Sequence, residues 1–301
     1  MQMSKKKQES LEMTEQEFLE SYDSSQYERP SVTNDIIILT TENKEEENIR
    51  KLPRKGMQVL LLKRKEHPEK GCYSIPGGFV DVKEGLMEGA YRKLQEETGI
   101  KNVYIEQLYT FGTVERDPRT RVITVANMAL VPKENIVVQE NNKYETNWFW
   151  MEKKQKEQAE TSHHFVRKYQ LSLISEDNKV VMEYEVMERI KKSILREKEV
   201  SYQLLEESTH RLAFDHYSIL DHAISRLRNK VEYTPIAVYL LPPLFTVKEL
   251  QYVYEAILGR EITNFRRKIG DMIVETDEII EGRPFRPAQV YKFNENWEHE
   301  F

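Results

Sequence analysis

Apolar residues along this chain follow two spacings, that of buried strands and that of amphipathic helices. The run DIIIL within Ser31 to Thr40 and the run MQVLLLKR after residues 42–55 have the length and composition of buried strands. From Leu86 to Leu94 apolar residues instead recur every three or four positions, which predicts a helix that begins after Gly85 and stops at Gly99. Two strands therefore precede a helix, and the turn-rich sequence GCYSIPGGFVDV joins them.

Three later apolar runs also have strand character: VYIEQLYTFG, RVITVANMALV and NWFW. Residues 152–211 carry a weaker pattern, in which a hairpin around Ser175 to Lys179 joins two alternating runs and charged sequence of helical character follows. A helix with one apolar face then covers Leu212 to Arg228, and Tyr233 to Pro235 ends it. The pattern assigns no role to residues 152–211.

Residues 231–301 contain two predicted helices followed by two predicted strands. Thr246 and Glu249 have capping-box spacing ahead of the amphipathic run ELQYVYEAIL, which Gly259 ends. A second, basic helix is predicted in ITNFRRKIGDM, and the runs IVETDEII and PAQVYKF can pair around the loop EGRPFR. Helix, turn, basic helix and basic-tipped hairpin is the order of a winged helix-turn-helix.

Composition narrows the class of protein. With 39% hydrophobic and 32% charged residues in 301, the chain has enough apolar surface for a folded, soluble protein of two units. The net charge of -6 means that any DNA binding must come from a local basic cluster. The single cysteine, Cys72, excludes intramolecular disulfides and cysteine-rich zinc sites. No apolar run is long enough for a bilayer or a signal peptide, so we expect no membrane partner and a cytoplasmic location.

A pattern of glycine, acidic residues and arginine covers the turn-rich segment and the helix after it, and it resembles the Nudix box. The matching residues, in order and spacing, are Gly78, Glu84, Arg92, Leu94, Glu96, Glu97, Gly99 and Ile100. The resemblance implies a diphosphate-binding domain from about Arg29 to Phe149, with hydrolysis assisted by Mg²⁺. It also implies the site: metal ligands at Gly77, Gly78, Glu96 and Glu97, and catalytic roles for Glu96, Glu97 and Arg92, the last orienting the carboxylates.

Position 93 departs from this family pattern, because Lys93 stands where the family has a glutamate. At about 100° per residue, positions 93, 96 and 97 share one side of the helix. The ammonium group can therefore pair with Glu96 or Glu97 and take the electrostatic place of a cation. We expect weakened Mg²⁺ binding and feeble or absent hydrolysis. In the alternative, Lys93 points to solvent and catalysis proceeds on both glutamates and a distant carboxylate, for which Glu140 or Glu145 is a candidate.

Arginines near the predicted cleft are candidates for binding a ligand that carries phosphate or ribose. They are Arg64, which closes a predicted strand, and Arg116, Arg119 and Arg121 in the segment VERDPRTR between two strands. The alternative for that segment is a simple solvated hairpin.

The stretches FDHYSILDHAISRLRNKVEYTP, FTVKELQYVYEAILGREITNFRRK and GRPFRPAQVYKF, together with the box, resemble the NrtR family of Nudix-related transcriptional regulators. That resemblance implies a Nudix sensor, often catalytically impaired, joined to a winged helix that binds operator DNA as a dimer. It also implies effectors of the ADP-ribose type, or a pentose. The expected DNA contacts are Asn264, Arg266, Arg267 and Lys268 on the second helix and Arg283 and Arg286 on the wing. Acidic neighbours nearly cancel the local positive charge, so weak non-specific binding is expected.

We therefore expect an α+β protein: a Nudix α/β/α sandwich with a mixed sheet, followed by a C-terminal winged helix-turn-helix domain. The predicted divisions are an N-terminal appendage (1–28), a Nudix domain (29–211, with an insertion at about 152–211), a connecting helix (212–230) and the winged helix domain (231–301). The leading hypothesis is a homodimeric regulator of operator DNA that responds to a nucleotide or sugar. Two enzymatic alternatives are an active Mg²⁺-dependent ADP-ribose pyrophosphatase with an accessory C-terminal domain and a bifunctional protein. A winged helix used only for dimerisation or protein contacts is the structural alternative.

Overall fold

A large mixed sheet forms the centre of the computed structural model, which describes residues 13–46, 48, 51–100, 103–136, 144–280 and 288–298. Eight strands follow the order β10-β9-β8-β7-β2-β1-β6-β5, while β3 pairs with β2 and β4 with β1. Within this sheet β1 and β6 run parallel and the other pairs are antiparallel. The strands are β1 (Ser31–Asn43), β2 (Lys55–Arg64), β3 (Tyr73–Ser74), β4 (Gly77–Phe79), β5 (Tyr104–Phe111), β6 (Val122–Leu130), β7 (Tyr144–Glu160), β8 (His164–Ser175), β9 (Val181–Lys191) and β10 (Lys198–Leu204).

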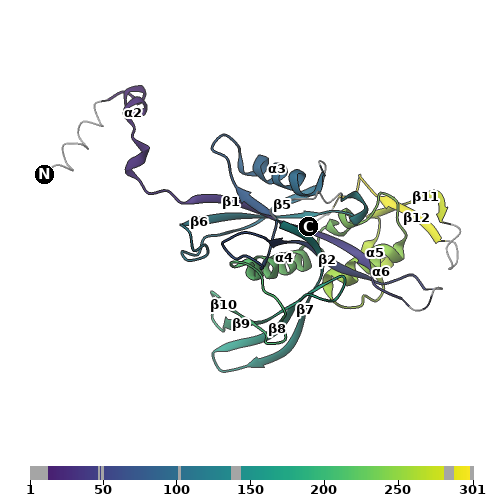
Figure 1. Ribbon diagram of the computed structural model, residues 1–301. Coiled ribbons are helices and arrows are strands. Elements are labelled where there is room, and N and C mark those ends of the chain that lie inside the picture. The colour runs from purple at the N-terminus through teal and green to yellow at the C-terminus, as the bar shows by residue number, and fades with distance from the viewer. Residues whose placement is uncertain are drawn as a thin grey trace.

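Helices cover both faces of this sheet, with α3 (Leu86–Thr98) on one side and α4 (His216–Lys230) on the other (Figure 1). The alternation of side chains along β1 explains the two layers. Ile36 and Ile38 pack with Leu94 of α3, whereas the neighbouring apolar residues of β1 join the core on the α4 side. The α/β/α sandwich with a mixed sheet that the sequence predicts is confirmed.

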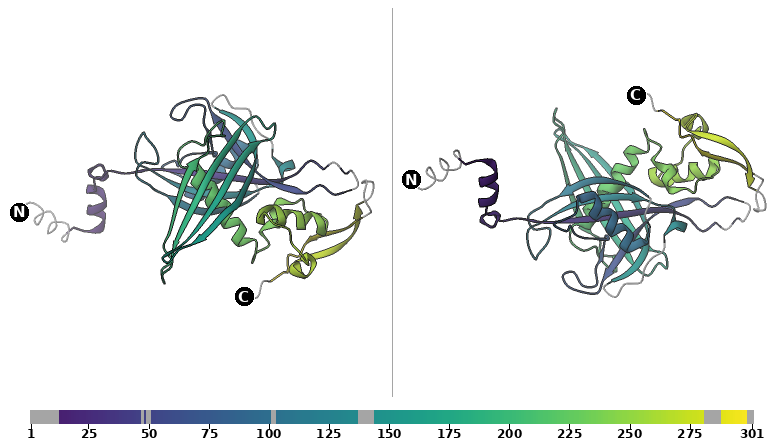
Figure 2. Two further views of the ribbon diagram at one scale, coloured as in Figure 1. Left: turned by 90° about the horizontal axis from the view of Figure 1, so that it is seen from below. Right: turned by 90° about the horizontal axis from the view of Figure 1, so that it is seen from above.

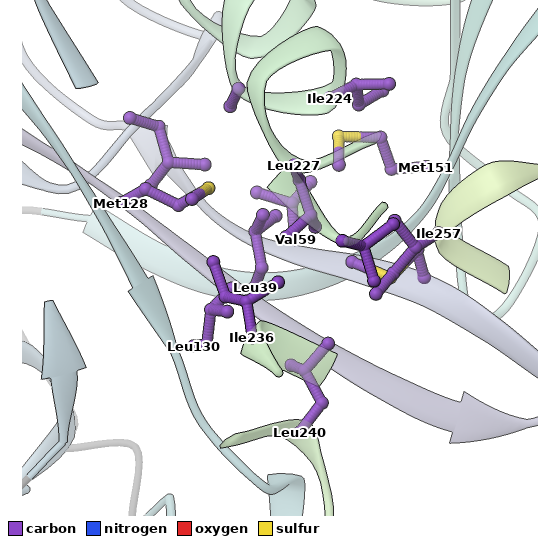
Figure 3. Close-up of a cluster of buried hydrophobic side chains, with 14 of the residues drawn as sticks. Leu39, Val59, Met128, Leu130, Met151, Ile224, Leu227, Ile236, Leu240 and Ile257 are labelled. Atoms are coloured by element: carbon purple, nitrogen blue, oxygen red, sulfur yellow. The ribbon is translucent and has the colours of Figure 1, made fainter. Parts of the chain in front are cut away.

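The core on the α4 side continues without a break into the C-terminal part of the chain. It runs from the sheet through α4 to the 3-10 turn η3 (Ile236–Leu240) and to α5 (Val247–Leu258). Figure 3 shows side chains that meet there: Leu39, Val59, Met128, Leu130, Met151, Ile224, Leu227, Ile236, Leu240 and Ile257. The helix predicted to connect two domains is thus packed along its length, and the division into domains stays a prediction.

The C-terminal part is a winged helix, as predicted, and consists of α5, α6 (Phe265–Ile269), β11 (Ile273–Ile280) and β12 (Ala288–Phe293). Thr246 and Glu249 form the expected capping box at the start of α5. The second helix is shorter than predicted. Asn264, with a φ of 54°, precedes its first residue, and Gly270, with a φ of 49°, follows its last, so a residue of positive φ bounds it at each end.

The prediction of helical sequence after the two alternating runs was wrong. The hairpin and the runs that it joins are present as β8 and β9, but the charged residues that follow form β10, which extends the sheet to its edge. Along β9 the side chains alternate between buried positions, such as Tyr184 and Val186, and outward acidic positions. The charged residues that suggested a helix instead include the edge strand β10, most of whose side chains are exposed.

The N-terminal residues stand apart from the rest of the molecule. The helix α2 (Glu15–Ser21) begins with a capping box between Thr14 and Glu17 and buries none of its side chains. A 3-10 turn, η1 (Ser24–Gln26), joins it to β1. Figure 2 shows this segment at the end of the molecule opposite the winged helix.

Candidate functional site

The box residues meet through a network centred on Arg92. Its guanidinium donates two hydrogen bonds to Glu84, of 2.8 and 2.6 Å, and a third of 3.0 Å to Oε1 of Glu96. The bonds from Arg92 lower the pKa of Glu84 to about 2, so this carboxylate is ionised at neutral pH. Arg92 therefore holds one oxygen of Glu96, and the catalytic roles of both residues stay predictions.

Lys93 lies inside the box and does not point to solvent. Its Nζ is 2.6 Å from Oε2 of Glu96, and only 22% of its side chain is exposed. The lysine stem also lies across Gly78, since a Cβ built on that glycine would come within 2.7 Å of the Lys93 Cε atom. Both oxygens of Glu96 are thus held by cationic side chains, one by Arg92 and the other by Lys93.

Glu97 is separated from this pair. It is buried, and it accepts a hydrogen bond from the hydroxyl of Tyr144 at the start of β7. Burial raises the pKa of Glu97, which disfavours the ionised form that a metal ligand needs. The structure therefore places Glu96 and Glu97 on the same helix but gives each a partner of its own.

The donor set does not fit a magnesium ion. Mg²⁺ needs several oxygen ligands in an octahedron, whereas both oxygens of Glu96 are held by cationic side chains and Glu97 is buried against the hydroxyl of Tyr144. In the described part of the chain, no group of three histidine, cysteine, aspartate or glutamate side chains could hold a metal ion. Glu145 is exposed, and Glu140 lies outside the described residues.

A cavity of about 370 Å³ opens beside the box, between β1, β2, β4, the segment before β6 and the start of α4. Gly77 and Gly78 form part of its wall, as does Tyr144, the partner of Glu97. A side chain at position 77 would collide with the backbone oxygen of Asn34, 2.5 Å from its Cβ. The box thus contributes a smooth glycine wall to a cleft large enough for part of a nucleotide.

Two arginines present guanidinium groups to this cavity, each beside an aromatic ring. Arg119 pairs with Asp117 at 2.8 Å and lies 5.7 Å from the ring of Phe79. Arg64 donates to the carbonyl of Pro68 and lies 5.3 Å from the ring of Phe214. Burial, and then the charge of Arg119, lowers the pKa of Arg64. An anionic group in the cavity would relieve this repulsion between like charges.

The other two candidate arginines have different environments. Arg121 donates to the carbonyls of Thr113 and Val122 and does not line the cavity. Arg116 lines the cavity, but its side chain is only 5% exposed and makes a bidentate pair with Asp215, at 2.7 and 3.0 Å. It also lies 3.6 Å from Asp35. The guanidinium of Arg116 therefore forms an ion pair with the residue just before α4.

His216, the first residue of α4, closes the cavity on that side. It is buried, and its Nδ1 accepts the backbone N–H of Ile75 at 2.9 Å. Burial disfavours the charged ring, and with the nearby positive charge of Arg116 it lowers the pKa of His216 to about 4.

This histidine predicts a pH dependence of stability. A lowered pKa in the folded state means that its contribution is complete above the ordinary pKa near 6.5 and is lost as the pH falls toward 4. Between pH 7 and pH 4 the wild type is expected to lose about 3 kcal/mol more unfolding free energy than His216→Gln. Urea unfolding of both proteins at several pH values measures this. Asp35 and Glu97 titrate in both proteins, so their contributions cancel in the difference between the two unfolding free energies. If the unfolding free energies of the two proteins depended on pH in the same way, the lowered pKa assigned to His216 would be contradicted.

The winged helix carries the predicted basic residues on its second helix. Arg266, Arg267 and Lys268 are exposed on α6, while Phe265 and Ile269 face the core. The Arg266 guanidinium lies 4.6 Å from the ring of Tyr291 on β12. Asn264 is the residue just before the helix. The predicted contacts Arg283 and Arg286 lie outside the described residues.

Helix α4 links the cavity to the winged helix. Its N-terminal end carries the Arg116 pair and His216, and near its C-terminal end Arg228 donates to the carbonyl of Ile257 in α5 at 2.9 Å. Just after the helix, Glu232 accepts from Lys268 of α6 at 2.5 Å and from Arg260 at 3.1 Å. One rigid element therefore contacts both candidate sites.

Several of these residues could not be found from the sequence. Tyr144, Asp215, His216 and Glu232 belong to no motif with a fixed spacing, and each acts on a partner far away in the chain. The one available signal was the segment FDHY, which was part of the resemblance but carried no assigned role.

Comparison with known proteins places both parts of the chain. The NUDIX domain model matches residues 35–169, and the model of the NrtR DNA-binding winged helix domain matches residues 237–293. The chain is 32% identical over 287 residues to the "ADPR responsive transcriptional repressor NtrR" of Acinetobacter baylyi, covering 93% of this chain and 88% of that protein.

Two crystal structures match over most of their length. A MutT/nudix family protein from Enterococcus faecalis has a TM-score of 0.68 and 26% identity, with 98% of this chain and 99% of that chain covered. Shewanella oneidensis NrtR in complex with a 27mer DNA has a TM-score of 0.54 and 26% identity, with 87% and 93% covered. Separately, no helix among the described residues is both long enough and apolar enough to span a bilayer.

Proposed function

Because this chain belongs to the NrtR family of Nudix-related transcriptional regulators, we propose that it is a ligand-responsive regulator of transcription. Its Nudix cleft senses an ADP-ribose-like nucleotide, and its winged helix binds operator DNA. The observation that carries this proposal is Lys93, whose ammonium group occupies Glu96 inside an otherwise complete box. Such a box is built to recognise a diphosphate and is poorly suited to hydrolysing one.

The cleft supports a nucleotide effector. The Acinetobacter baylyi relative is described as ADPR responsive. In this chain Arg64 and Arg119 supply guanidinium groups for phosphate oxygens, and the rings of Phe79 and Phe214 beside them offer surfaces on which a base can stack. A sugar alone would use fewer of these groups, so the nucleotide is the better fit.

The winged helix supports DNA binding. The matched structure of Shewanella oneidensis NrtR contains a 27mer DNA. Here the exposed side chains of α6 place three cations on the second helix of the helix-turn-helix, the element that enters the major groove in this motif. Arg267 is the one most open to bases or phosphates, since Arg266 lies over Tyr291 and Lys268 pairs with Glu232. We propose that two copies of the chain bind a symmetric operator.

Coupling between the two sites runs through α4 in this proposal. A ligand that reaches His216 or the Arg116 pair acts on one end of the helix. The other end holds Lys268 through Glu232. A shift of α4 would change the orientation of α6 and the charge that it offers to DNA, provided that the effector binds the two arrangements with different affinity.

A gel shift tests the proposal directly. Full-length protein is titrated into DNA from upstream of its own gene and neighbouring genes, with and without ADP-ribose. We expect a shift that ADP-ribose changes, and we expect Arg267→Ala to weaken it by about 10-fold to 100-fold. Arg189→Ala, which removes an exposed arginine from β9 in the large sheet, is the matched control and should leave binding unchanged. Absence of any shift would contradict the proposed DNA binding. A shift that ADP-ribose does not change would contradict the proposed sensing of this nucleotide.

The second candidate function is Mg²⁺-dependent hydrolysis of ADP-ribose to AMP and ribose 5-phosphate. It is favoured by Glu84, Arg92, Glu96 and Glu97, which retain the family pattern, and by the network that Arg92 forms. Brisk magnesium-dependent release of AMP by the wild-type protein would establish it. The pairing of Lys93 with Glu96 leads us to expect feeble release.

A further inference from the structure

A cationic side chain, Lys93 of α3, lies directly against the glycine wall of the cavity. The Lys93 ammonium group is 2.6 Å from Glu96, and its stem rests against Gly78, which lines the cavity. A Cβ built on Gly78 would lie 3.3 Å from the Lys93 Nζ atom, so the ammonium group sits at the cavity wall.

The remaining charges of the cavity fit an anion bound by protein groups alone. Of the acidic residues that line it, the buried Asp35 and Asp117 are already paired, with Arg116 and Arg119 respectively, and Glu66 is exposed. Arg64 and Arg119 contribute two guanidinium groups to the lining, and the ammonium group of Lys93 lies beside Gly78 of its wall. Protein cations can neutralise diphosphate oxygens through charge-assisted hydrogen bonds, which removes the need for a divalent ion.

We infer that Lys93 is the built-in cation of this cleft, so that the chain binds the diphosphate of a nucleoside diphosphate sugar without a divalent metal. The inference rests on the proposed function, since it concerns how the sensor recognises its effector. In the complex Lys93 donates to a diphosphate oxygen while it keeps Glu96 as its counter-ion. Effector recognition is then independent of the cellular magnesium level.

Isothermal titration calorimetry of the full-length protein with ADP-ribose tests this, in parallel buffers containing EDTA or millimolar MgCl₂. The wild type is expected to bind with the same Kd in both. Lys93→Met should weaken binding about tenfold or more in both buffers, because it removes a charge-assisted hydrogen bond. Lys93→Glu should bind weakly in EDTA and recover at least about tenfold on addition of Mg²⁺, because it restores the missing carboxylate.

Two controls make the result specific. Lys83→Glu makes the same charge reversal at an exposed residue in the turn before α3 and should bind like the wild type in both buffers. Titration of Mn²⁺ alone should give heat with Lys93→Glu and none with the wild type. Tenfold weaker binding of ADP-ribose by the wild type in EDTA, or unchanged binding by Lys93→Met, would overturn the inference and leave the sensor in place. Absence of ADP-ribose binding in either buffer would overturn the proposed effector and this inference with it.

Discussion

Replacing Arg116 by alanine will lower the free energy of unfolding by about 3 to 5 kcal/mol, the cost of breaking a buried ion pair by removing one partner. Arg116 is almost fully buried and makes two hydrogen bonds to Asp215, with Asp35 at 3.6 Å. Burial raises the pKa of Asp35 even with this arginine present. Without it, two carboxyl groups between the sheet and α4 lose their counter-ion.

Urea unfolding followed by circular dichroism measures the loss. Arg121→Ala is the matched control from the same segment, since Arg121 donates only to backbone carbonyls in the interactions described, and it should change stability by about 0.5 kcal/mol or less. A loss below about 1 kcal/mol for Arg116→Ala would show that Arg116 is not structural. It would return this residue to the group of candidate ligand-binding arginines.

The second large effect is expected at Lys153, on the face of β7 that meets α4. Its side chain is only 4% exposed, with Nζ 2.5 Å from Asp221 of α4 and 3.4 Å from Glu188 of β9. Glu188 keeps a second partner in Lys198, whereas Asp221 is left with the hydroxyl of Tyr202. Lys153→Met should therefore cost about 3 to 5 kcal/mol of unfolding free energy, because it strands a buried carboxylate.

The adjacent residue supplies the control for this prediction. Lys154 pairs with Glu152 at the surface, so Lys154→Met should cost about 1 kcal/mol or less. The double variant Lys153→Met, Asp221→Asn should be more stable than Lys153→Met alone, because it removes the stranded charge as well. Equal losses at positions 153 and 154, or a double variant no better than the single one, would contradict the assignment.

The sequence predicted those parts of the fold in which one periodicity dominates. The apolar run of β1 and the three-to-four spacing of α3 and α5 are repeated strongly enough to identify each element and its burial. β10 has no dominant periodicity, because both of its faces are rich in exposed polar residues, as is common at the edge of a sheet. The sequence therefore did not identify it as a strand. The length of α6 was predicted wrongly for another reason, because the backbone conformation at Asn264 and Gly270 sets its ends.

The candidate site was predicted only as far as its residues lie within one motif. Glu84, Arg92 and Glu96 are close in sequence and close in space, and the pairing of Lys93 with Glu96 follows from helical spacing. The burial of Glu97 could not be foreseen, because its partner Tyr144 comes from a different strand. For the same reason the pairing of Arg116 with Asp215, just before α4, could not be foreseen, and its predicted role in ligand binding stays a prediction.

The placement of α4 has a consequence for how a ligand in the cleft would affect DNA binding by the winged helix. In the proposed regulator, α4 lines the cleft through His216, and Glu232 just after the helix pairs with α6, so a single free energy would connect the two binding equilibria. If the small molecule changes the affinity for the operator by some factor, the operator must change the affinity for the small molecule by the same factor. Two subunits bound at a promoter would then become half-saturated at a different metabolite concentration than subunits free in solution.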